Sequence, residues 1–440
     1  MAQPEKGSKK LLNAWAFYDW ANSVYSLVIA TAIFPLYYES LFPEGQEHIN
    51  AFGTSMKGTA LMSFVMAFAF LIVAFISPLL SGIADYAGNK KTFMKIFCYL
   101  GAFSCMGLYW FDLENLYLSL VCYLFGLIGF WGSLVFYNSY LPDIAYPEQQ
   151  DRVSAKGFSM GYLGSVILLI VNLAMVMKPE LFFITGATKG EMAVKAMRIS
   201  FITVGLWWIL FSQYSYLYLP KGVKGNRVTR DVMLNGFREL RKVWLQLGEN
   251  RTLKRFLGSY FVYSMAVQTV MLVAAFFGAK EIQWPDADAK RMGLIVSILL
   301  IQLVAIAGAV ITSRLSEKYG NIKILIGLNC IWAVVCIFAF FITLPVHFYV
   351  TAGVVGLVMG GIQSLSRSTY SKFLPQTNDT TSFFSFFDVT EKIGIVIGML
   401  LYGAIDQVFG SMRYSVIFLT VFFVIGILLL LRVPKRMTGQ

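Results

Sequence analysis

The sequence predicts an all-α integral membrane protein with twelve transmembrane helices. Of its 440 residues, 57% are hydrophobic and only 14% are charged, and the mean hydropathy is +0.65. Apolar runs long enough to cross a bilayer recur along the whole chain. The expected spans are 11–38, 58–80, 93–111, 114–138, 157–177, 199–219, 254–279, 292–313, 322–344, 346–370, 383–405 and 414–431.

The positive charge is distributed unevenly between the two sides of the predicted membrane. The formal net charge is +12, and most of the 36 Lys and Arg residues fall on the side that holds both termini. Because cytoplasmic loops are enriched in Lys and Arg, both termini are expected in the cytoplasm. The charge therefore reports topology and gives no reason to expect a nucleic-acid partner. The first span carries an aspartate and lacks a small-residue cleavage site, so we expect it to be retained rather than removed as a signal peptide.

The first span carries a carboxylate near the middle of the bilayer. Asp19 lies eight residues after Leu11, or about 12 Å along the helix. Asn22, Ser23 and Ser26 follow on the same face. A carboxylate at this depth costs about 3 kcal/mol, so this face must meet protein or a water-filled cavity. Either Asp19 bonds to a neighbouring helix as a packing group, or it lines a central cavity and binds substrate or a proton.

An internal repeat divides the chain into two halves. The segment SGIADYAGNKK (81–91) follows the second span, and SRLSEKYGNIK (313–323) follows the eighth. Asp85 aligns with Glu317, and Gly88 aligns with Gly320. Parallel repeats of this kind build secondary transporters from two halves. We therefore expect two six-helix bundles, at 1–219 and 254–440, joined by a linker at 220–253.

The repeated turns also suggest a gate on the cytoplasmic side. In each copy a carboxylate ends a helix and a glycine allows the turn. The carboxylate is expected to contact either the N-terminus of a helix, such as the one opening at Thr381–Ser382, or an arginine such as Arg152. Such contacts would hold the bundles together in one state and break in another. The alternative is a turn that charges merely keep soluble. The predicted gate consists of Asp85, Gly88, Arg152, Glu317, Gly320 and Arg367.

The eleventh predicted span carries three charges. Asp388 and Lys392 are four residues apart and are expected to form an ion pair, which leaves Glu391 without an assigned partner. The cluster is either a static lock or a proton-linked gate or substrate contact. Polar residues in the seventh span serve either helix packing or substrate binding. The predicted substrate or proton site consists of Asp19, Asn22, Tyr263, Gln268, Asp388, Glu391 and Lys392.

The linker is predicted to contain an amphipathic helix on the cytoplasmic membrane surface. Its apolar positions recur at helical spacing, with basic residues between them. The predicted apolar stripe is Met233, Phe237, Leu240, Trp244 and Leu247.

The repeated loop resembles the signature Gly-x-Leu-Ala-Asp-Arg-x-Gly-Arg-Lys of the major facilitator superfamily, from which it departs at Ser81, Tyr86 and Asn89. Four segments resemble the vacuolar-effluxer-type branch of that superfamily, which is named for autophagy-linked amino-acid exporters. They are 16–26, 136–145, 263–270 and 363–394. The resemblance implies the major facilitator fold and a small-molecule substrate, amino acids or related metabolites. Because the branch is largely bacterial, it also implies a bacterial plasma membrane.

The residues that are characteristic of enzymes and of metal-binding proteins are absent from this sequence. The two histidines, His48 and His347, are far apart, and no metal-ligand cluster, nucleophile triad or phosphate loop is present. We therefore expect no enzyme, no cofactor and no metal. A channel would need a filter loop that is missing here. A non-transporting receptor, and efflux of a peptide, sugar or drug, stay open as alternatives. We expect a monomer in the bilayer, whereas the substrate, the direction of transport and the coupling ion are left open.

Overall fold

Helices make up almost all of the computed structural model, which describes residues 4–42, 48–222 and 232–434, with the side chains of 232–236 outside it. Within these residues, twelve helical segments are long and apolar enough to span a membrane. The helices are α1 (Lys9–Val24), α2 (Phe34–Ser40), α3 (Gly58–Ala87), α4 (Lys90–Gly107), α5 (Leu116–Asn138), α6 (Leu141–Ile144), α7 (Pro147–Met177), α8 (Lys189–Tyr218), α9 (Val232–Glu249), α10 (Arg251–Glu281), α11 (Ala287–Tyr319), α12 (Asn321–Phe341), α13 (Pro345–Phe373), α14 (Thr380–Phe409) and α15 (Met412–Leu431).

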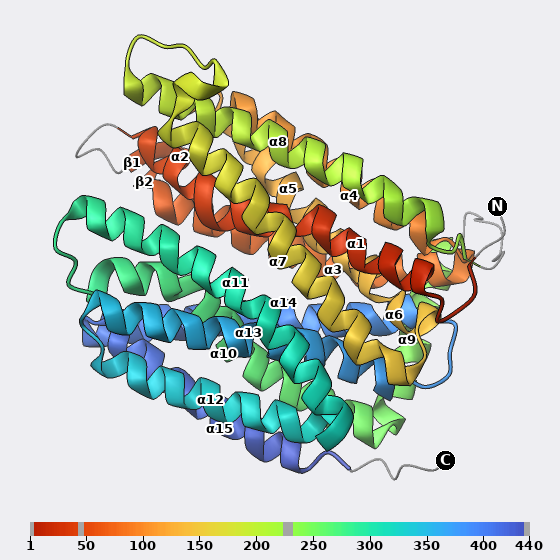
Figure 1. Ribbon diagram of the computed structural model, residues 1–440. Coiled ribbons are helices and arrows are strands. Elements are labelled where there is room, and N and C mark those ends of the chain that lie inside the picture. The colour runs from red at the N-terminus through yellow and green to blue at the C-terminus, as the bar shows by residue number, and fades with distance from the viewer. Residues whose placement is uncertain (1–3, 43–47, 223–231, 435–440) are drawn as a thin grey trace.

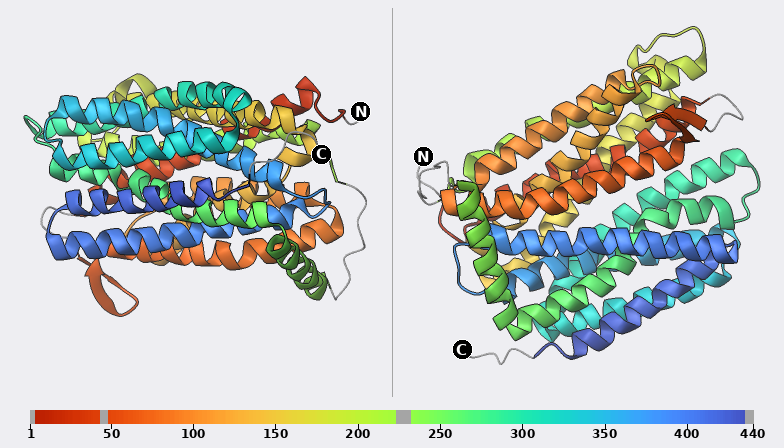
Figure 2. Two further views of the ribbon diagram at one scale, coloured as in Figure 1. Left: turned by 90° about the horizontal axis from the view of Figure 1, so that it is seen from below. Right: turned by 180° about the vertical axis from the view of Figure 1, so that it is seen from behind.

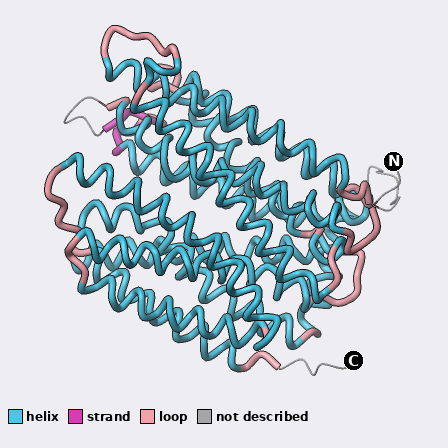
Figure 3. The backbone as a smooth tube through the Cα atoms, viewed as in Figure 1, coloured by secondary structure: helices cyan, strands magenta, loops and turns pink. Residues whose placement is uncertain are grey.

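The helices pack as two bundles, α1–α8 and α10–α15, each around its own apolar core (Figure 1). Trp15 and Trp208 are buried in the first core, and Trp332 and Tyr370 in the second. Both ends of the chain lie at one end of the molecule, which we call the terminus side. The antiparallel strands β1 (His48–Ala51) and β2 (Thr54–Lys57) mark the opposite end, the hairpin side (Figure 3). The chain is thus a twelve-helix membrane protein of two bundles, as the sequence predicts.

Two seams join the bundles. α3 packs against α14, and α7 packs against α11 and α13. The bundles lie close together at the terminus side and diverge toward the hairpin side (Figure 1). The repeated turns follow α3 and α11, so each turn ends one helix of a seam. Gly88 and Gly320 have φ values of +61° and +86°, a region that a side chain disfavours, which explains glycine at both turns.

The sequence predicts one continuous helix for the first span, but in the structure this span is irregular. A π-helical segment, Tyr25–Ile33, separates α1 from α2. Its wide turn brings the Thr31 hydroxyl within 2.8 Å of the carbonyl of Ser26, five residues earlier. Asp19 and Asn22 precede this segment and lie in α1. Two other helices begin about ten residues before their predicted spans: α7 starts at Pro147 rather than 157, and α8 starts at Lys189 rather than 199.

Helix α9 of the linker crosses the terminus side and packs against α3 of one bundle and α10 and α14 of the other (Figure 2, right). The predicted helix is present, but its apolar residues do not share one environment. Leu247 is buried against protein, together with Val243, while Phe237 and Trp244 are 56% and 61% exposed. The side chain of Met233 lies outside the described residues. One face of α9 therefore packs against the bundles. Leu247 of the predicted apolar stripe lies on that face, whereas Phe237 and Trp244 are exposed.

Candidate functional site

A buried ion pair joins the two bundles at Asp19. The Arg367 guanidinium of α13 donates to Asp19 Oδ2 from both terminal nitrogens, each at 3.3 Å, and the Tyr137 hydroxyl donates to the same oxygen at 2.8 Å. The side chains of Asp19 and Arg367 are only 6% and 4% exposed. The carboxylate predicted to face either a cavity or a neighbouring helix is therefore paired with a cation from the opposite bundle.

The Arg367 guanidinium is held by several further groups of the first bundle. It donates to the Ser154 hydroxyl and carbonyl at 2.9 Å each, and to the Asn138 side chain at 3.1 Å. The rings of Phe158 and Trp15 lie 4.1 and 4.8 Å from the guanidinium carbon. Aromatic faces attract a guanidinium. The sequence predicts Arg367 as a gate residue only, whereas in the structure it lies at the Asp19 site and at the seam between the bundles.

Two glycines of α7 let that helix approach α1 closely. A Cβ atom at Gly157 would lie 2.4 Å from Asp19 Oδ2, and one at Gly161 would lie 2.5 Å from the Ser23 hydroxyl. One turn beyond Asp19, the buried Asn22 amide nitrogen has no hydrogen-bond partner among the described residues. Asp19 and Ser23 of the predicted polar face therefore lie against α7, whereas Ser26 is exposed and the Asn22 amide nitrogen has no described partner.

The charged cluster of α14 is more fully bonded than the sequence predicts. Lys392 pairs with Asp388 at 2.8 Å, as expected, and also with Glu391 at 3.0 Å. Glu391 is not without partners, because Tyr260 and Gln268 of α10 donate to its Oε1 at 3.0 and 2.6 Å. Its position one turn from Asp388 did not reveal these partners, which come from another helix.

The α14 cluster also contacts the first bundle, because Lys392 Nζ lies 3.6 Å from the ring centre of Trp131 on α5.

Two residues of α10 in the predicted site, Gln268 and Tyr263, have different partners. Gln268 bonds to Glu391 of the cluster. The Tyr263 hydroxyl instead bonds to Ser366 at 2.7 Å and lies in the core of the second bundle. Gln268 thus belongs to the α14 cluster, whereas no described hydrogen bond links Tyr263 to it.

Asp85 caps a helix of the opposite bundle. Its carboxylate accepts from the Ser382 backbone N–H and hydroxyl at 2.7 Å each, and from the Thr381 N–H at 3.3 Å. These groups open α14, which is the contact predicted from the repeat. Lys90, in the following turn, bonds to Thr380 at 3.1 Å and pairs with Asp143. The first repeated turn is therefore tied to the N-terminus of α14.

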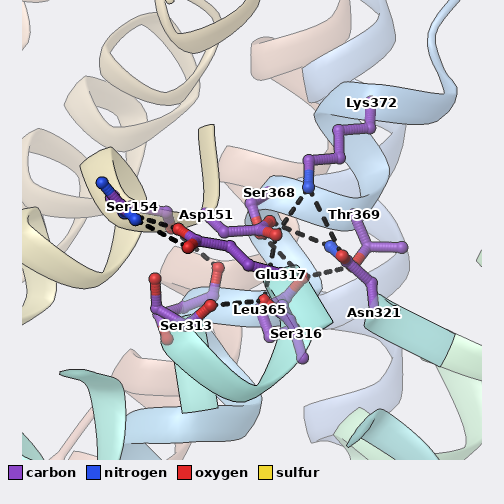
Figure 4. Close-up of polar contacts among 12 residues, drawn as sticks. Asp151, Ser154, Ser313, Ser316, Glu317, Asn321, Leu365, Ser368, Thr369 and Lys372 are labelled. Carbon is purple, nitrogen blue, oxygen red and sulfur yellow. Dashed lines mark hydrogen bonds and ion pairs between the residues drawn. The ribbon is translucent and has the colours of Figure 1, made fainter. Parts of the chain in front are cut away.

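The second repeated turn contacts α7, the counterpart of α14 in the first bundle (Figure 4). Glu317 pairs with Arg152 through two hydrogen bonds of 2.5 and 2.7 Å. The neighbouring Asp151 is buried and pairs with Lys372 at 2.5 Å, and Ser316 and Asn321 also donate to it, at 3.0 and 2.9 Å. Sequence analysis missed Asp151 and Lys372, although Asp151 lies beside Arg152 in the first turns of α7.

The comparisons with known proteins agree with this architecture. Residues 7–438 match the family described as vacuole effluxer Atg22 like. The chain belongs to this family. The Atg22-like chain is 31% identical over 427 residues, 96% of its length and 95% of the relative's, to an uncharacterized MFS-type transporter, YxiO, of Bacillus subtilis (strain 168). It is 26% identical over 315 residues to autophagy-related protein 22 of Yarrowia lipolytica, 64% of this chain and 51% of the yeast protein.

Solved structures with the same fold are transporters of the major facilitator superfamily (MFS). FucP in the outward conformation aligns with a TM-score of 0.70 and 13% identity, over 97% of the Atg22-like chain and 98% of that structure. The proton:xylose symporter XylE aligns with a TM-score of 0.69 and 12% identity, over 97% and 95%. These structures show the fold, and the family match and the 31% identical MFS-type transporter show that the Atg22-like chain is an MFS-type transporter of the membrane rather than an enzyme.

Proposed function

We propose that the chain transports amino acids by alternating access, and that Asp19 and Arg367 bind the two charges of the substrate. The observation that carries this proposal is the buried Asp19–Arg367 pair between the bundles. An amino acid carries an ammonium and a carboxylate on the same carbon, so the two charged groups are separated by only two bonds. Its ammonium suits Asp19, and its carboxylate suits the fork of donors on Arg367.

In this proposal the substrate replaces the protein's own ion pair. While the site is empty, the two side chains neutralise each other, which lowers the cost of burying them. A zwitterion that enters from the hairpin side would contact both, so neither charge is left unpaired. The rings of Trp15 and Phe158 around Arg367 supply apolar walls for the substrate side chain. The resemblance to autophagy-linked amino-acid exporters, together with the match to the vacuole effluxer family, makes amino acids the first class to test.

The repeated turns act as the gate of this cycle. The contact of Asp85 of α3 with the start of α14, and those of Glu317 and Asp151 with their partners, close the terminus side in this proposal. Release of the substrate on that side requires these contacts to part. Because Lys and Arg are enriched on the terminus side, this side is cytoplasmic in the proposal. The membrane is the plasma membrane of a bacterium, and the chain works as a monomer. Attachment of an impermeant reagent to a cysteine placed at exposed Lys221, in intact cells against lysed cells, tests the orientation.

The decisive experiment is exchange of labelled amino acids into proteoliposomes that are preloaded with the unlabelled mixture. We expect saturable exchange by the parent and its loss in Asp19→Asn and in Arg367→Lys, since Lys has no planar fork. Asp288→Asn, at an exposed position in the first turn of α11, is the matched control and is expected to exchange normally. A folded parent that exchanges no amino acid would overturn the substrate class, and peptides, sugars and drugs would be tested next.

A further inference from the structure

The α14 cluster of Asp388, Glu391 and Lys392 has an uneven charge. Two carboxylates share one ammonium, and Lys392 is only 1% exposed. Asp388 lies about 12 Å along α14 from its first residue, within the membrane span. One negative charge is therefore left over in a place where an uncompensated charge costs several kcal/mol.

One carboxylate oxygen of this cluster has no partner. Lys392 bonds to Asp388 Oδ1, whereas Asp388 Oδ2 is buried and accepts no hydrogen bond from any described residue. The whole Asp388 residue is 6% exposed. The Glu391 oxygens, by contrast, are both bonded. A buried carboxylate oxygen that accepts nothing is uncommon, and the lone pair of Asp388 Oδ2 is therefore available to a proton.

From the orphan oxygen and the excess charge we infer that Asp388 is the binding site of a proton that the transporter carries with its substrate. This inference rests on the proposed function and adds the coupling ion to it. A proton needs a single lone pair, which Asp388 Oδ2 offers. A hard metal cation needs several oxygen ligands, and no cluster of three metal-ligating residues occurs among the described residues.

The groups that face Asp388 support a site of this kind. On α14 itself they are Lys392, which pairs with Asp388 at 2.8 Å, and Glu391, which shares that ammonium at 3.0 Å. From α10 the Tyr260 hydroxyl reaches Glu391, and from α5 the uncharged ring of Trp131 covers Lys392.

Two further charges near α14 lie closer to its N-terminus and are themselves bonded, and Asp406, near the other end of α14, pairs with Lys280. The Asp85 carboxylate of α3 accepts a hydrogen bond from Ser382, and Lys242 of α9 forms an ion pair with Asp379. Each is held by the groups at the start of α14, so neither of these two supplies the missing partner of Asp388.

Lys392 connects the proton site to the seam between the bundles. Its ammonium contacts Asp388, Glu391 and the face of Trp131 from the opposite bundle. A proton on Asp388 removes one of the two anions that hold Lys392 and makes the cluster neutral. The ammonium is then held by Glu391 and by Trp131, a cation–π contact that changes when the bundles move. Proton binding and bundle movement are thereby linked through one side chain.

The test uses the full chain in proteoliposomes that contain a pH-sensitive dye, with a mixture of common amino acids as the probe. We expect substrate movement in the parent to be accompanied by a change of internal pH. A gradient of one pH unit should drive about a tenfold accumulation if one proton moves with each substrate. A sodium gradient without a pH gradient should drive none. Accumulation driven by sodium, or exchange that no pH gradient affects, would overturn the inference while leaving amino-acid exchange intact.

The variant Asp388→Asn removes the site, and Asp406→Asn on the same helix is its matched control. Asp406 pairs one-to-one with Lys280 near the opposite end of α14, and its side chain is 29% exposed, so it carries no excess buried charge although its Oδ1 also lacks a described partner. In Asp388→Asn we expect the ratio of gradient-driven accumulation to exchange at equal pH to fall about tenfold, to the level without a gradient. In Asp406→Asn the ratio should match the parent. An unchanged ratio in Asp388→Asn would refute the site. If Asp388→Asn fails to fold, the parent's response to the two gradients still decides whether a proton is carried.

Discussion

At the scale of single residues, Gly157 determines whether α7 can lie against the Asp19–Arg367 pair. A Cβ there would be 2.4 Å from Asp19 Oδ2 and 3.0 Å from an Arg367 nitrogen. We predict that Gly157→Ala destabilises this closed arrangement by about 1–3 kcal/mol, the usual cost of overpacking, and slows amino-acid exchange. Gly353→Ala is the control, because nothing lies within 4 Å of a Cβ there. Equal exchange rates for the two variants would refute the close approach.

The two acidic contacts of α7 differ in burial, and burial decides which one matters more. The Asp151 side chain is 2% exposed, whereas that of Arg152 is 71% exposed. Removing one partner of a buried pair costs about 3 kcal/mol, while exposed pairs contribute little. We predict that Asp151→Asn opens the terminus side far more than Arg152→Gln. Alkylation of a cysteine at Ser368, which lies at this seam (Figure 4), measures the opening in a cysteine-free background. Equal rates in the two variants would contradict the ranking.

Some site residues could be predicted from the sequence and others could not, for a physical reason. Asp19 and Asp388 stand out because a charge inside an apolar run is costly wherever it occurs. Asp85 and Glu317 stand out because the repeat marks them. Tyr137 looks like any other apolar-span aromatic in the sequence, and its role depends on a contact with a helix far away in the chain. Contacts between helices, which also supply the partners of Glu391, leave no periodic pattern in the sequence.

At the scale of helices, the sequence predicts the spans well and their ends less well. Apolar length locates each bilayer-crossing segment, and all twelve are present. An apolar run ends at the first cluster of charges, so its length does not predict the polar turns that extend α7 back to Pro147. Asp151 and Arg152 lie in these turns. Those turns are polar because they contact the other bundle. The residues that apolar length overlooks are therefore the ones that form the terminus-side contacts.

Helix α9 is held to the second bundle by a contact that depends on pH. The hydrogen bond from Lys242 to Asp379 raises the pKa of the Lys242 ammonium above its usual range. A raised pKa means that this contact stabilises α9 below the ordinary value, near pH 10.5, and is lost as the pH rises through the raised value. We predict that a spin label at exposed Arg241 becomes more mobile above about pH 10.5. In Lys242→Met, mobility should be higher throughout and flat over this range.

At the scale of the whole molecule, the repeat predicts two bundles but not the state in which they rest. The Asp85 and Glu317 contacts are related by the same repeat and lie on opposite seams, α3 with α14 and α11 with α7. Two equivalent latches on opposite seams fit rigid bundles that rock about the site between them. The free-energy difference between two conformations of the same sequence decides which seam contacts are formed. Local sequence patterns carry no information on that difference.

Rigid rocking makes a quantitative prediction about Asp85 and Asp151, two carboxylates whose contacts lie at the two different seams. Asp85 bonds to groups at the start of α14, whereas Asp151 bonds to residues of α11, α12 and α13, so the two carboxylates share no described partner. If both hold one closed state, Asp85→Ala and Asp151→Asn each shift the same equilibrium, and their free energies add. We predict that the double variant shifts the opening equilibrium by the sum of the single shifts, within about 0.5 kcal/mol. The equilibrium is read from the alkylation rate of the Ser368 cysteine. A double variant no more open than Asp151→Asn alone would mean that the seams open independently, as local helix movements, rather than through one rotation of the bundles.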